Sequence, residues 1–427
     1  MFLYWKILIF LDFPTPTSCI STLYLFSSLA VAIFNYSCED KSLVESANIE
    51  FNVVEFEPVS VKKNLKTPIY VHYMPWFQTP YVTGYWGPHW TMANKNPDEK
   101  INGRRSIASH YYPLIGPYDS NDSDYLEYAL ICMKLSGIDG VLIDFYGQSK
   151  FNDYPQLLTA SNAVIEMCEK VGLDFAIVYE DRTIKSILDQ GYGNKVGLAK
   201  EDLLYIEKNY FSKSHYINID NKPILLNFGP ITLTSNEDWE NAFSEIKTDF
   251  YFFPLAYHPQ YYNLNTIVDG VYSWVGEAQS DDFYNYGKQF DYFGGSGIFE
   301  FREFYEEGGW DETGQSDILP RDGNLLRETL EKSIASGVDF IQLITWNDWG
   351  EGTAIEPSVE YQFEPLSIIQ EFIGVPFKKE DLDLPITLYF MRKEYKNNTL
   401  INKKLDQVFY YLVSLQTENA KEILDDL

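Results

Sequence analysis

The chain has 427 residues and a formal net charge of −29 at pH 7, with 33 Lys and Arg against 62 Asp and Glu. So much negative charge repels phosphates, which excludes nucleic-acid binding as a function. The length suffices for one large domain or two to three small ones, and the aromatic content is high, with 33 Tyr, 29 Phe and 9 Trp.

Residues 1–38 have the features of an export segment. The stretch from Cys19 to Cys38 is uncharged, and the chain turns polar directly after it. A membrane span needs about 20 apolar residues, and an apolar core that ends near small residues fits a signal peptide better. NYSC before EDKS resembles a bacterial lipobox. We therefore predict lipidation of Cys38, a membrane partner through the lipid anchor, and a periplasmic or cell-surface location as an outer-membrane lipoprotein.

Residues 39–65 are predicted to be a linker and lead-in, and residues 66–375 show a regular alternation. Short β-branched or aromatic runs are separated by helical patterns, several of which end in glycine, as SDYLEYALICMKLSG does. The eight runs are IYVHYMPW, GVLIDFYG, FAIVYED, PILLNFGP, FYFFPLAY, GVYSW, GGSGIFEF and FIQLITWNDW. Strands that alternate with helices pair in parallel, so the sequence predicts an α/β fold, a (β/α)8 TIM barrel.

A doubly wound open sheet is the alternative fold. It normally carries a glycine-rich phosphate loop after an early strand, and GGSG at Gly294–Gly297 lacks the GxGxxG spacing. Residues 376–427 show apolar spacing of three and four from Pro385 onward, which predicts two or three helices packed on the barrel.

Several kinds of catalytic site find no support in the sequence. Cys132 and Cys168 lie in helical apolar patterns and are interpreted as core thiols, and no CxxC pair is present. Five histidines at no ligand spacing predict neither a metal site nor a cofactor, and the absence of GxSxG argues against a serine nucleophile. Paired carboxylates among aromatic residues remain, and that combination indicates glycosidase chemistry.

Polar and aromatic residues gather where the predicted strands end, which is where barrel enzymes place their active sites. His72 is interpreted as a packed, hydrogen-bonded histidine and His89 as a loop residue. We expect substrate contacts from the following set, some of whose members are equally at home in a core: Trp76, Tyr111, Asp144, Tyr146, Glu180, Asn227, Tyr257, Trp274, Asn347 and Glu356.

The closing stretch NDWGEGTAIE, from Asn347 to Glu356, resembles the motif Asn-Glu-Trp-His-Glu-Gly-Thr-x-Ile-Glu of the glycoside hydrolase family 99 endo-α-mannosidases, broadly the family 71/99-like glycosidases. VHYMPWF…GYWGPHW and ASHYYPLIGPYDSND resemble the family's first strand with its aromatic loop and its Tyr-Pro-x-x-Gly-x-Tyr stretch. The similarity covers roughly Thr67 to Tyr395.

This resemblance implies a metal-independent retaining mechanism that runs through a 1,2-anhydro sugar. By position, Asp348 would deprotonate the sugar 2-hydroxyl, and Glu351 would protonate the leaving oxygen and then activate water. The chain departs from the motif at two places, since the family has Glu at Asp348 and His at Gly350. Asp is one methylene shorter, which withdraws the carboxylate by roughly 1.5 Å. A misplacement of that size can cost about a hundredfold in rate.

The sequence therefore predicts an exported glycoside hydrolase that acts internally on α-mannan-type polysaccharides or oligosaccharides. Two other functions stay open. One is a glycosyltransferase-like protein of polysaccharide synthesis, which would be cytoplasmic, so the export segment counts against it. The other is a non-catalytic glycan-binding lipoprotein, for which the shortened acid at Asp348 is the support.

Overall fold

The computed structural model describes residues 51–256, 264, 266–311 and 313–427. Glu50–Leu427 form one unit, and every element named below lies in it. Three predictions fall outside the described residues and stay predictions: the export segment of residues 1–38 with its lipidated Cys38, the first part of the linker, and the substrate contact of Tyr257.

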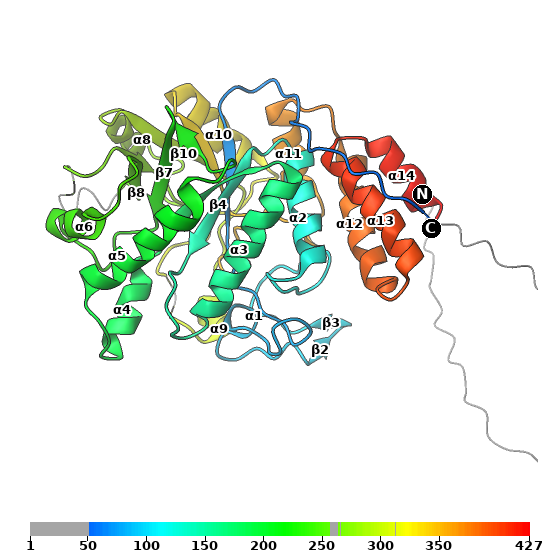
Figure 1. Ribbon diagram of the computed structural model, residues 1–427, viewed down its shortest axis with the longest axis horizontal. Helices are drawn as coiled ribbons and strands as arrows, with labels where there is room; N and C mark the ends of the chain where they lie inside the picture. The colour runs from blue at the N-terminus through cyan, green and yellow to red at the C-terminus, as the bar shows by residue number, and fades with distance from the viewer. Residues whose placement is uncertain (1–50, 257–263, 265, 312) are drawn as a thin grey trace, which may run out of the picture. The chain divides into compact units, whose positions relative to one another are not determined.

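Eight parallel strands run through the centre of this unit and close into a barrel (Figure 1). Seven neighbouring pairs share parallel ladders, and a bridge from Leu255 to Tyr272 joins the two ends of the sheet. This closure confirms the barrel and contradicts the open sheet. The barrel strands are β1 Ile69–Tyr73, β4 Gly140–Phe145, β5 Asp174–Tyr179, β7 Lys222–Asn227, β8 Tyr251–Pro254, β9 Gly270–Tyr272, β10 Tyr292–Ile298 and β11 Phe340–Ile344.

All eight strands lie within the runs that the sequence predicts or overlap them. Strand β4, GVLIDF, is buried at every position, as expected of a parallel strand that is covered on both faces. Its apolar residues fill the layers inside and outside the barrel, and Asp144 is the only charged residue in that strand. A carboxylate in such a position needs a partner or a function.

Helices cover the outside of the barrel. Gly172 and Gly337 follow two of them with φ of 76°, the left-handed conformation that ends a helix at glycine. Cys132 and Cys168 are free and buried in α2 and α3, as predicted. The helices are α1 Pro88–Thr91, α2 Ser123–Leu135, α3 Tyr154–Val171, α4 Arg182–Asp189, α5 Lys195–Ile206, a π-helix Glu207–Phe211, α6 Asn236–Phe243, α8 Asp281–Gly287, α9 Tyr305–Gly308, α10 Asn324–Ser336 and α11 Glu364–Ile373; short strands β2 Lys100–Ile101, β3 Arg104–Arg105 and β6 Asn218–Ile219 complete the connections.

Three C-terminal helices follow the barrel: α12 Lys379–Glu394, α13 Thr399–Val413 and α14 Thr417–Asp425 (Figure 1). Helix α12 packs along α2, α13 also touches α2, and α14 packs on α12 and α13. The first begins before Pro385 instead of at it. Arg392 fixes α12 by contacting Glu127 of α2 at 3.0 Å and Asp406 of α13 at 2.6 Å. In the described part of the chain, no helix is both long and apolar enough to cross a bilayer.

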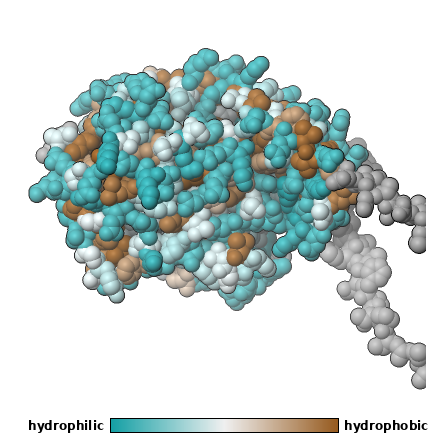
Figure 2. Space-filling model, viewed as in Figure 1, coloured by the Kyte–Doolittle hydropathy of each residue, from teal (hydrophilic) through white to brown (hydrophobic). Residues whose placement is uncertain are grey.

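The described part of the lead-in, from residue 51 onward, packs on the rest of the protein instead of forming a free linker. Val54 exchanges two hydrogen bonds with the side chain of Gln407 in α13, and Leu65 N donates to Ile373 O. The segment therefore lies along α13 and the end of α11 before it enters β1. The molecular face in Figure 2 is mostly hydrophilic with scattered apolar residues.

Candidate active site

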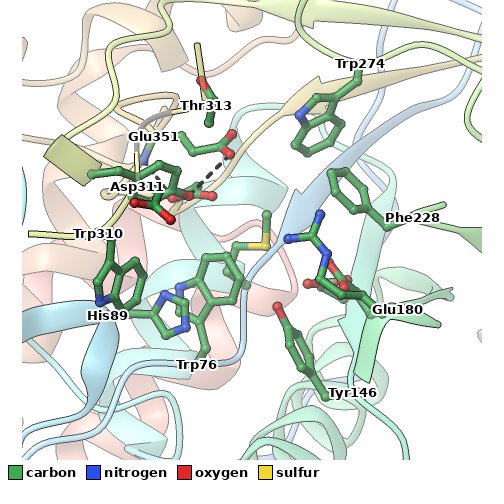
Figure 3. A pocket seen from close by; sticks show the side chains of 15 residues that line it. Trp76, His89, Tyr146, Glu180, Phe228, Trp274, Trp310, Asp311, Thr313 and Glu351 are labelled. Atoms are coloured by element: carbon green, nitrogen blue, oxygen red, sulfur yellow. Dashed lines mark hydrogen bonds between the residues drawn. The ribbon is translucent and has the colours of Figure 1, made fainter. Parts of the chain in front are cut away.

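A pocket of about 370 Å³ lies at the carboxyl ends of the barrel strands. Figure 3 shows Glu351 and Asp311 on one side of it and Glu180 and Tyr146 on the other. Seven residues predicted from the sequence line it: Trp76, Asp144, Tyr146, Glu180, Trp274, Asp348 and Glu351. The other lining residues are Met74, His89, Arg182, Phe228, Tyr305, Trp310, Asp311 and Thr313.

A sharp turn after β11 brings both proposed catalytic acids to this pocket. Asp348 N donates to Thr345 Oγ1 at 2.7 Å, and Glu351 N donates back to Asp348 Oδ1 at 2.9 Å. Gly352 has φ of 65°, and a Cβ there would lie 2.5 Å from Arg302 O, so both its conformation and its surroundings require glycine. The local sequence thus folds both carboxyl groups toward one space.

Asp348 is suited to accept a proton near neutral pH. Its side chain is buried, and this desolvation raises the pKa of the carboxyl from 3.8 to about 7. Hydrogen bonds from the backbone N–H groups of Glu351 and Gly350 oppose the rise, because they stabilise the carboxylate. A carboxyl with a pKa near the working pH can take up and return a proton with little cost.

Glu351 is suited to donate a proton. Desolvation raises the pKa of its carboxyl well above the usual range, and the negative charge of Asp348 raises it further. The Tyr305 hydroxyl, 3.3 Å from Glu351 Oε1, and the Arg182 guanidinium lower it. Two neighbouring carboxyls whose environments separate their pKa values divide naturally into a base and an acid.

A second group of charges lies across the pocket, where Asp144, Glu180 and Arg182 come together. Neither oxygen of Asp144 has a hydrogen bond of ordinary geometry among the described residues, although the Tyr146 hydroxyl lies near enough to lower the pKa of its carboxyl. Desolvation raises the pKa of Asp144 well above its usual value, followed by the charge of Glu180. Desolvation also raises the pKa of Glu180 to about 7, against the pull of Arg182. Unsatisfied buried acceptors that face a pocket suit the hydroxyl groups of a ligand.

We expect Asp144→Asn to stabilise the protein in alkali. Because the folded-state pKa of Asp144 is raised, the folded chain holds a proton that the unfolded chain releases, so this residue makes stability fall as pH rises above about 4. Asn carries no charge at any pH. Thermal melts should show the variant roughly 2–5 °C more stable than the parent at pH 8 and equal to it at pH 4. Equal melting temperatures at both pH values would contradict the assignment.

Two groups of aromatic rings line opposite sides of the pocket. Trp76 stacks on His89 with ring centroids 3.8 Å apart and planes within 3°, and Trp310 stands edge-on to His89 at 5.7 Å. On the other side Trp274 meets Phe228 at 4.7 Å (Figure 3). Trp310 is 36% exposed. Flat faces that remain open toward a polar pocket are suited to the apolar faces of sugar rings.

Four residues predicted to touch substrate lie outside the pocket and support its walls instead. Asn347 exchanges two hydrogen bonds with the backbone of Met74, and Asn227 donates to Tyr179 O. The remaining two are occupied by long-range partners: Glu356 accepts from Tyr118 Oη at 2.6 Å, and Tyr111 donates to Glu300. These four side chains bond to the protein and do not line the pocket, although Asn227 Oδ1 and Glu356 Oε1 have no hydrogen-bond partner among the described residues. Their contact with substrate stays a prediction.

The two histidine interpretations have different outcomes. His72 is fully buried with Nδ1 3.3 Å from Gln342 Oε1, as predicted, and burial lowers its pKa to about 4. His89 lies on the short helix α1 and lines the pocket, so its interpretation as a loop residue was wrong. In the residues that the structure describes, no group of three or more His, Cys, Asp or Glu is arranged to hold a metal ion.

Sequence reasoning missed Arg182, Tyr305 and Trp310. Arg182 directly follows Glu180 and Asp181 in VYEDR, so the rule of strand ends could have included it. Tyr305 and Trp310 belong to the long connection after β10, which has no strand or helix periodicity that would place them at the pocket. Only the folded path of that connection reveals their position.

Comparison with known proteins supports the fold. Two structures of the GH99 endo-α-mannosidase from Bacteroides thetaiotaomicron align with TM-scores of 0.56 and 0.53 at 16% and 19% identity. They cover 84% and 69% of this chain and 100% and 88% of their own. The chain has the fold of the GH99 endo-α-mannosidases. A glycoside hydrolase-like protein also aligns, with a TM-score of 0.50, 13% identity, and 76% and 97% of the two chains covered.

Comparison of sequences alone matches only a short part of the chain. A glycoprotein endo-α-1,2-mannosidase-like protein from Danio rerio is 29% identical over 87 residues, which are 18% of this chain and 20% of that protein. The chain thus matches about a fifth of the length of this curated relative. No family model matches the sequence. Together the comparisons confirm the resemblance to GH99 that the closing motif indicates.

Proposed function

We propose that this chain is an exported glycoside hydrolase that cleaves α-linked glycans internally, with α-mannan-type substrates and retention of configuration. The observation that carries the proposal is the meeting of Asp348 and Glu351 in one pocket, with raised pKa values of different height. The GH99 fold and the closing motif support the choice of α-mannan-type glycans over other polysaccharides.

The reaction starts at the 2-hydroxyl of the sugar. The Asp348 carboxylate removes the hydroxyl proton, and the freed oxygen attacks C1. The bond from C1 to the glycosidic oxygen breaks, and Glu351 gives its proton to the departing oxygen. The products of this step are a 1,2-anhydro sugar, a protonated Asp348 and an ionised Glu351.

Water completes the cycle. Glu351 takes a proton from the water as its oxygen attacks C1, the C1–O2 bond breaks, and Asp348 returns its proton to O2. Both carboxyl groups then regain their starting states. Because C1 is inverted twice, the anomeric configuration is retained.

The remaining pocket residues fit the binding of a neutral sugar chain. Asp144 and Glu180 offer acceptors to hydroxyl groups, and Arg182 offers donors beside them. Trp76 and the His89 ring stacked on it offer apolar surface, and the partly exposed ring of Trp310 is available to a neighbouring sugar. Such ring faces provide apolar contact area for the sugar, while the carboxyl groups of Asp144 and Glu180 fix the orientation of the sugar through its hydroxyl groups.

A panel of α-linked manno- and gluco-oligosaccharides tests the proposal. The folded chain should release oligosaccharides, not only monosaccharides, from an α-mannan-type substrate, and ¹H NMR should show the α-anomer first. Release of the β-anomer would refute retention. Binding of glycans without any hydrolysis would instead favour the non-catalytic glycan-binding lipoprotein, and transfer from an activated sugar donor would favour the glycosyltransferase-like alternative.

Export and lipid anchoring at Cys38 are a separate part of the proposal. Their support comes from the sequence alone, in the uncharged stretch that ends in NYSC. The structure does not describe these residues. Mass spectrometry of the membrane fraction should find a mature N-terminus at a lipidated Cys38. A chain that retains Met1 and residues 2–37 would overturn this part without touching the catalytic proposal.

A further inference from the structure

Tyr305 lies beside the acid/base from a part of the chain that the closing motif does not include. It is the first residue of α9, in the connection that follows β10, and its ring lines the pocket. Its hydroxyl donates a hydrogen bond to Glu351 Oε1 at 3.3 Å. The two residues are 46 positions apart in the sequence. Their contact therefore depends on how two loops of the barrel meet.

Backbone hydrogen bonds fasten these two loops together. Arg302 N donates to Glu351 O and Phe304 N donates to Gly350 O, both at 2.8 Å. The close approach of Gly352 to Arg302 O, where a Cβ would lie at 2.5 Å, allows the two chains to run this near. Tyr305 directly follows this fastened segment, so its backbone position relative to Glu351 is fixed by bonds that do not involve its own side chain.

Gly350 lies next to the ring of Tyr305. A Cβ at position 350 would lie 3.5 Å from Tyr305 Cε1, which is ordinary van der Waals contact, and 3.2 Å from Met92 Cε. The φ of Gly350 is not in the left-handed region, so its backbone conformation does not itself require glycine. The position at which this chain departs from the GH99 motif therefore packs against Tyr305.

We propose that Tyr305 is a positioning residue for the acid/base, which holds Glu351 by donating a hydrogen bond from its hydroxyl to the ionised carboxylate. The inference rests on the proposed function, in which Glu351 is ionised between the two steps. Tyr305 keeps its own proton throughout. In the first step its hydrogen bond stabilises the carboxylate that forms as Glu351 gives up its proton, and in the second it aims that carboxylate at the attacking water.

The charges around both groups agree with a neutral tyrosine donor. Desolvation raises the pKa of Tyr305 well above 10, and the charges of Glu351 and Asp348 raise it further, so the hydroxyl stays protonated. The groups that face Glu351 are Asp348 from its own loop, Glu303, Tyr305 and Asp311 from the connection after β10, and Arg182 from α4. Among them Asp348 and Glu303 raise the pKa of Glu351, while Tyr305 and Arg182 lower it.

Tyr305→Phe should shift the pH profile in one direction. Activity requires ionised Asp348 and protonated Glu351, so it rises through the pKa of Asp348, about 7, and falls through that of Glu351. Removing a donor to the carboxylate raises the pKa of Glu351, so the alkaline limb should move up by about 0.5–1 pH unit. We expect kcat on natural glycan to fall about 3–10-fold at the optimum, with KM changed less than about twofold.

Tyr292→Phe is the matched control. Tyr292 donates to Asp220 at 2.7 Å from the start of β10, at the end of the barrel away from the pocket. The Tyr292→Phe variant loses the same type of tyrosine–carboxylate hydrogen bond as Tyr305→Phe. We expect it to keep the pH profile of the parent protein. Because Phe preserves the ring of Tyr305, both variants should fold, which thermal melting checks.

A second readout needs no activity. In protein labelled with ¹³C at the glutamate carboxyl, the Glu351 signal is the one lost in Glu351→Gln, and its titration gives the pKa directly. We expect a higher pKa for Glu351 in Tyr305→Phe and no change in Tyr292→Phe. An unchanged Glu351 titration in Tyr305→Phe overturns the inference, whatever the activity. A parent protein that titrates as described but hydrolyses no glycan overturns the proposed function instead.

Discussion

Glu351→Gln should abolish turnover of a natural glycan, with a loss of about 10²–10⁴-fold in kcat. Gln matches the shape of Glu but has no proton to give to the departing oxygen. Binding should stay nearly unchanged, because Gln preserves the size of the side chain and leaves the other lining residues of the pocket in place. Steady-state kinetics on folded protein, with a natural oligosaccharide and an aryl glycoside, measures both effects.

Glu360→Gln is a suitable control for this loss. Glu360 follows the same loop, but its side chain contacts Arg104 and the backbone of Tyr112 outside the pocket. We expect it to keep the parent rate within about twofold. If Glu351→Gln retained the full rate on natural glycan, the closing motif would be an acidic turn without a catalytic role.

Asp348→Asn should be severe for natural and activated substrates alike, again by about 10²–10⁴-fold. The amide cannot remove the proton of the 2-hydroxyl, so the attack on C1 fails however good the leaving group is. Burial and the raised pKa of Asp348 mark it as a group that changes protonation during turnover. The same two assays as for Glu351→Gln provide the measurement.

The shorter acid at Asp348 makes a second substitution informative. Asp348→Glu restores the residue of the GH99 motif and keeps the carboxylate, so it should lose less activity than Asp348→Asn. Asp249→Asn, which removes an exposed carboxylate just before β8 at the far end of the barrel, should leave the rates unchanged. If Asp348→Asn and the parent were equally active on both substrates, another group would have to remove the proton of the 2-hydroxyl.

The barrel was predictable because its strands carry a strong local signal. Runs such as GVLIDF are apolar on both faces and are bounded by turns and glycine-terminated helices, so each could be located without knowledge of its neighbours. The C-terminal helices were found in the same way. Packing on the barrel was expected, whereas the contact with α2 in particular was not, and the early start of α12 was missed because Pro385 lies inside the helix.

The pocket was predictable only in part, because a place at a strand end does not fix the direction of a side chain. Asp144 and Glu180 reach the pocket, whereas the equally well-placed Asn227 turns to the backbone of its neighbouring strand. Glu356 lies in the predicted motif but pairs with Tyr118, 238 positions earlier. Such long-range hydrogen bonds decide which polar groups remain available to substrate. They cannot be predicted from a local sequence pattern, because the two partners are far apart in the chain.

The central claim is that Glu351 protonates the leaving oxygen while Asp348 acts on the sugar itself. The most direct test is the dependence of kcat/KM on leaving-group acidity across a series of aryl α-glycosides. The parent protein should show a shallow slope, and Glu351→Gln should show a steep one, since an unassisted leaving group depends on its own pKa. Identical slopes for the parent and Glu351→Gln would contradict the assignment of Glu351 as the acid.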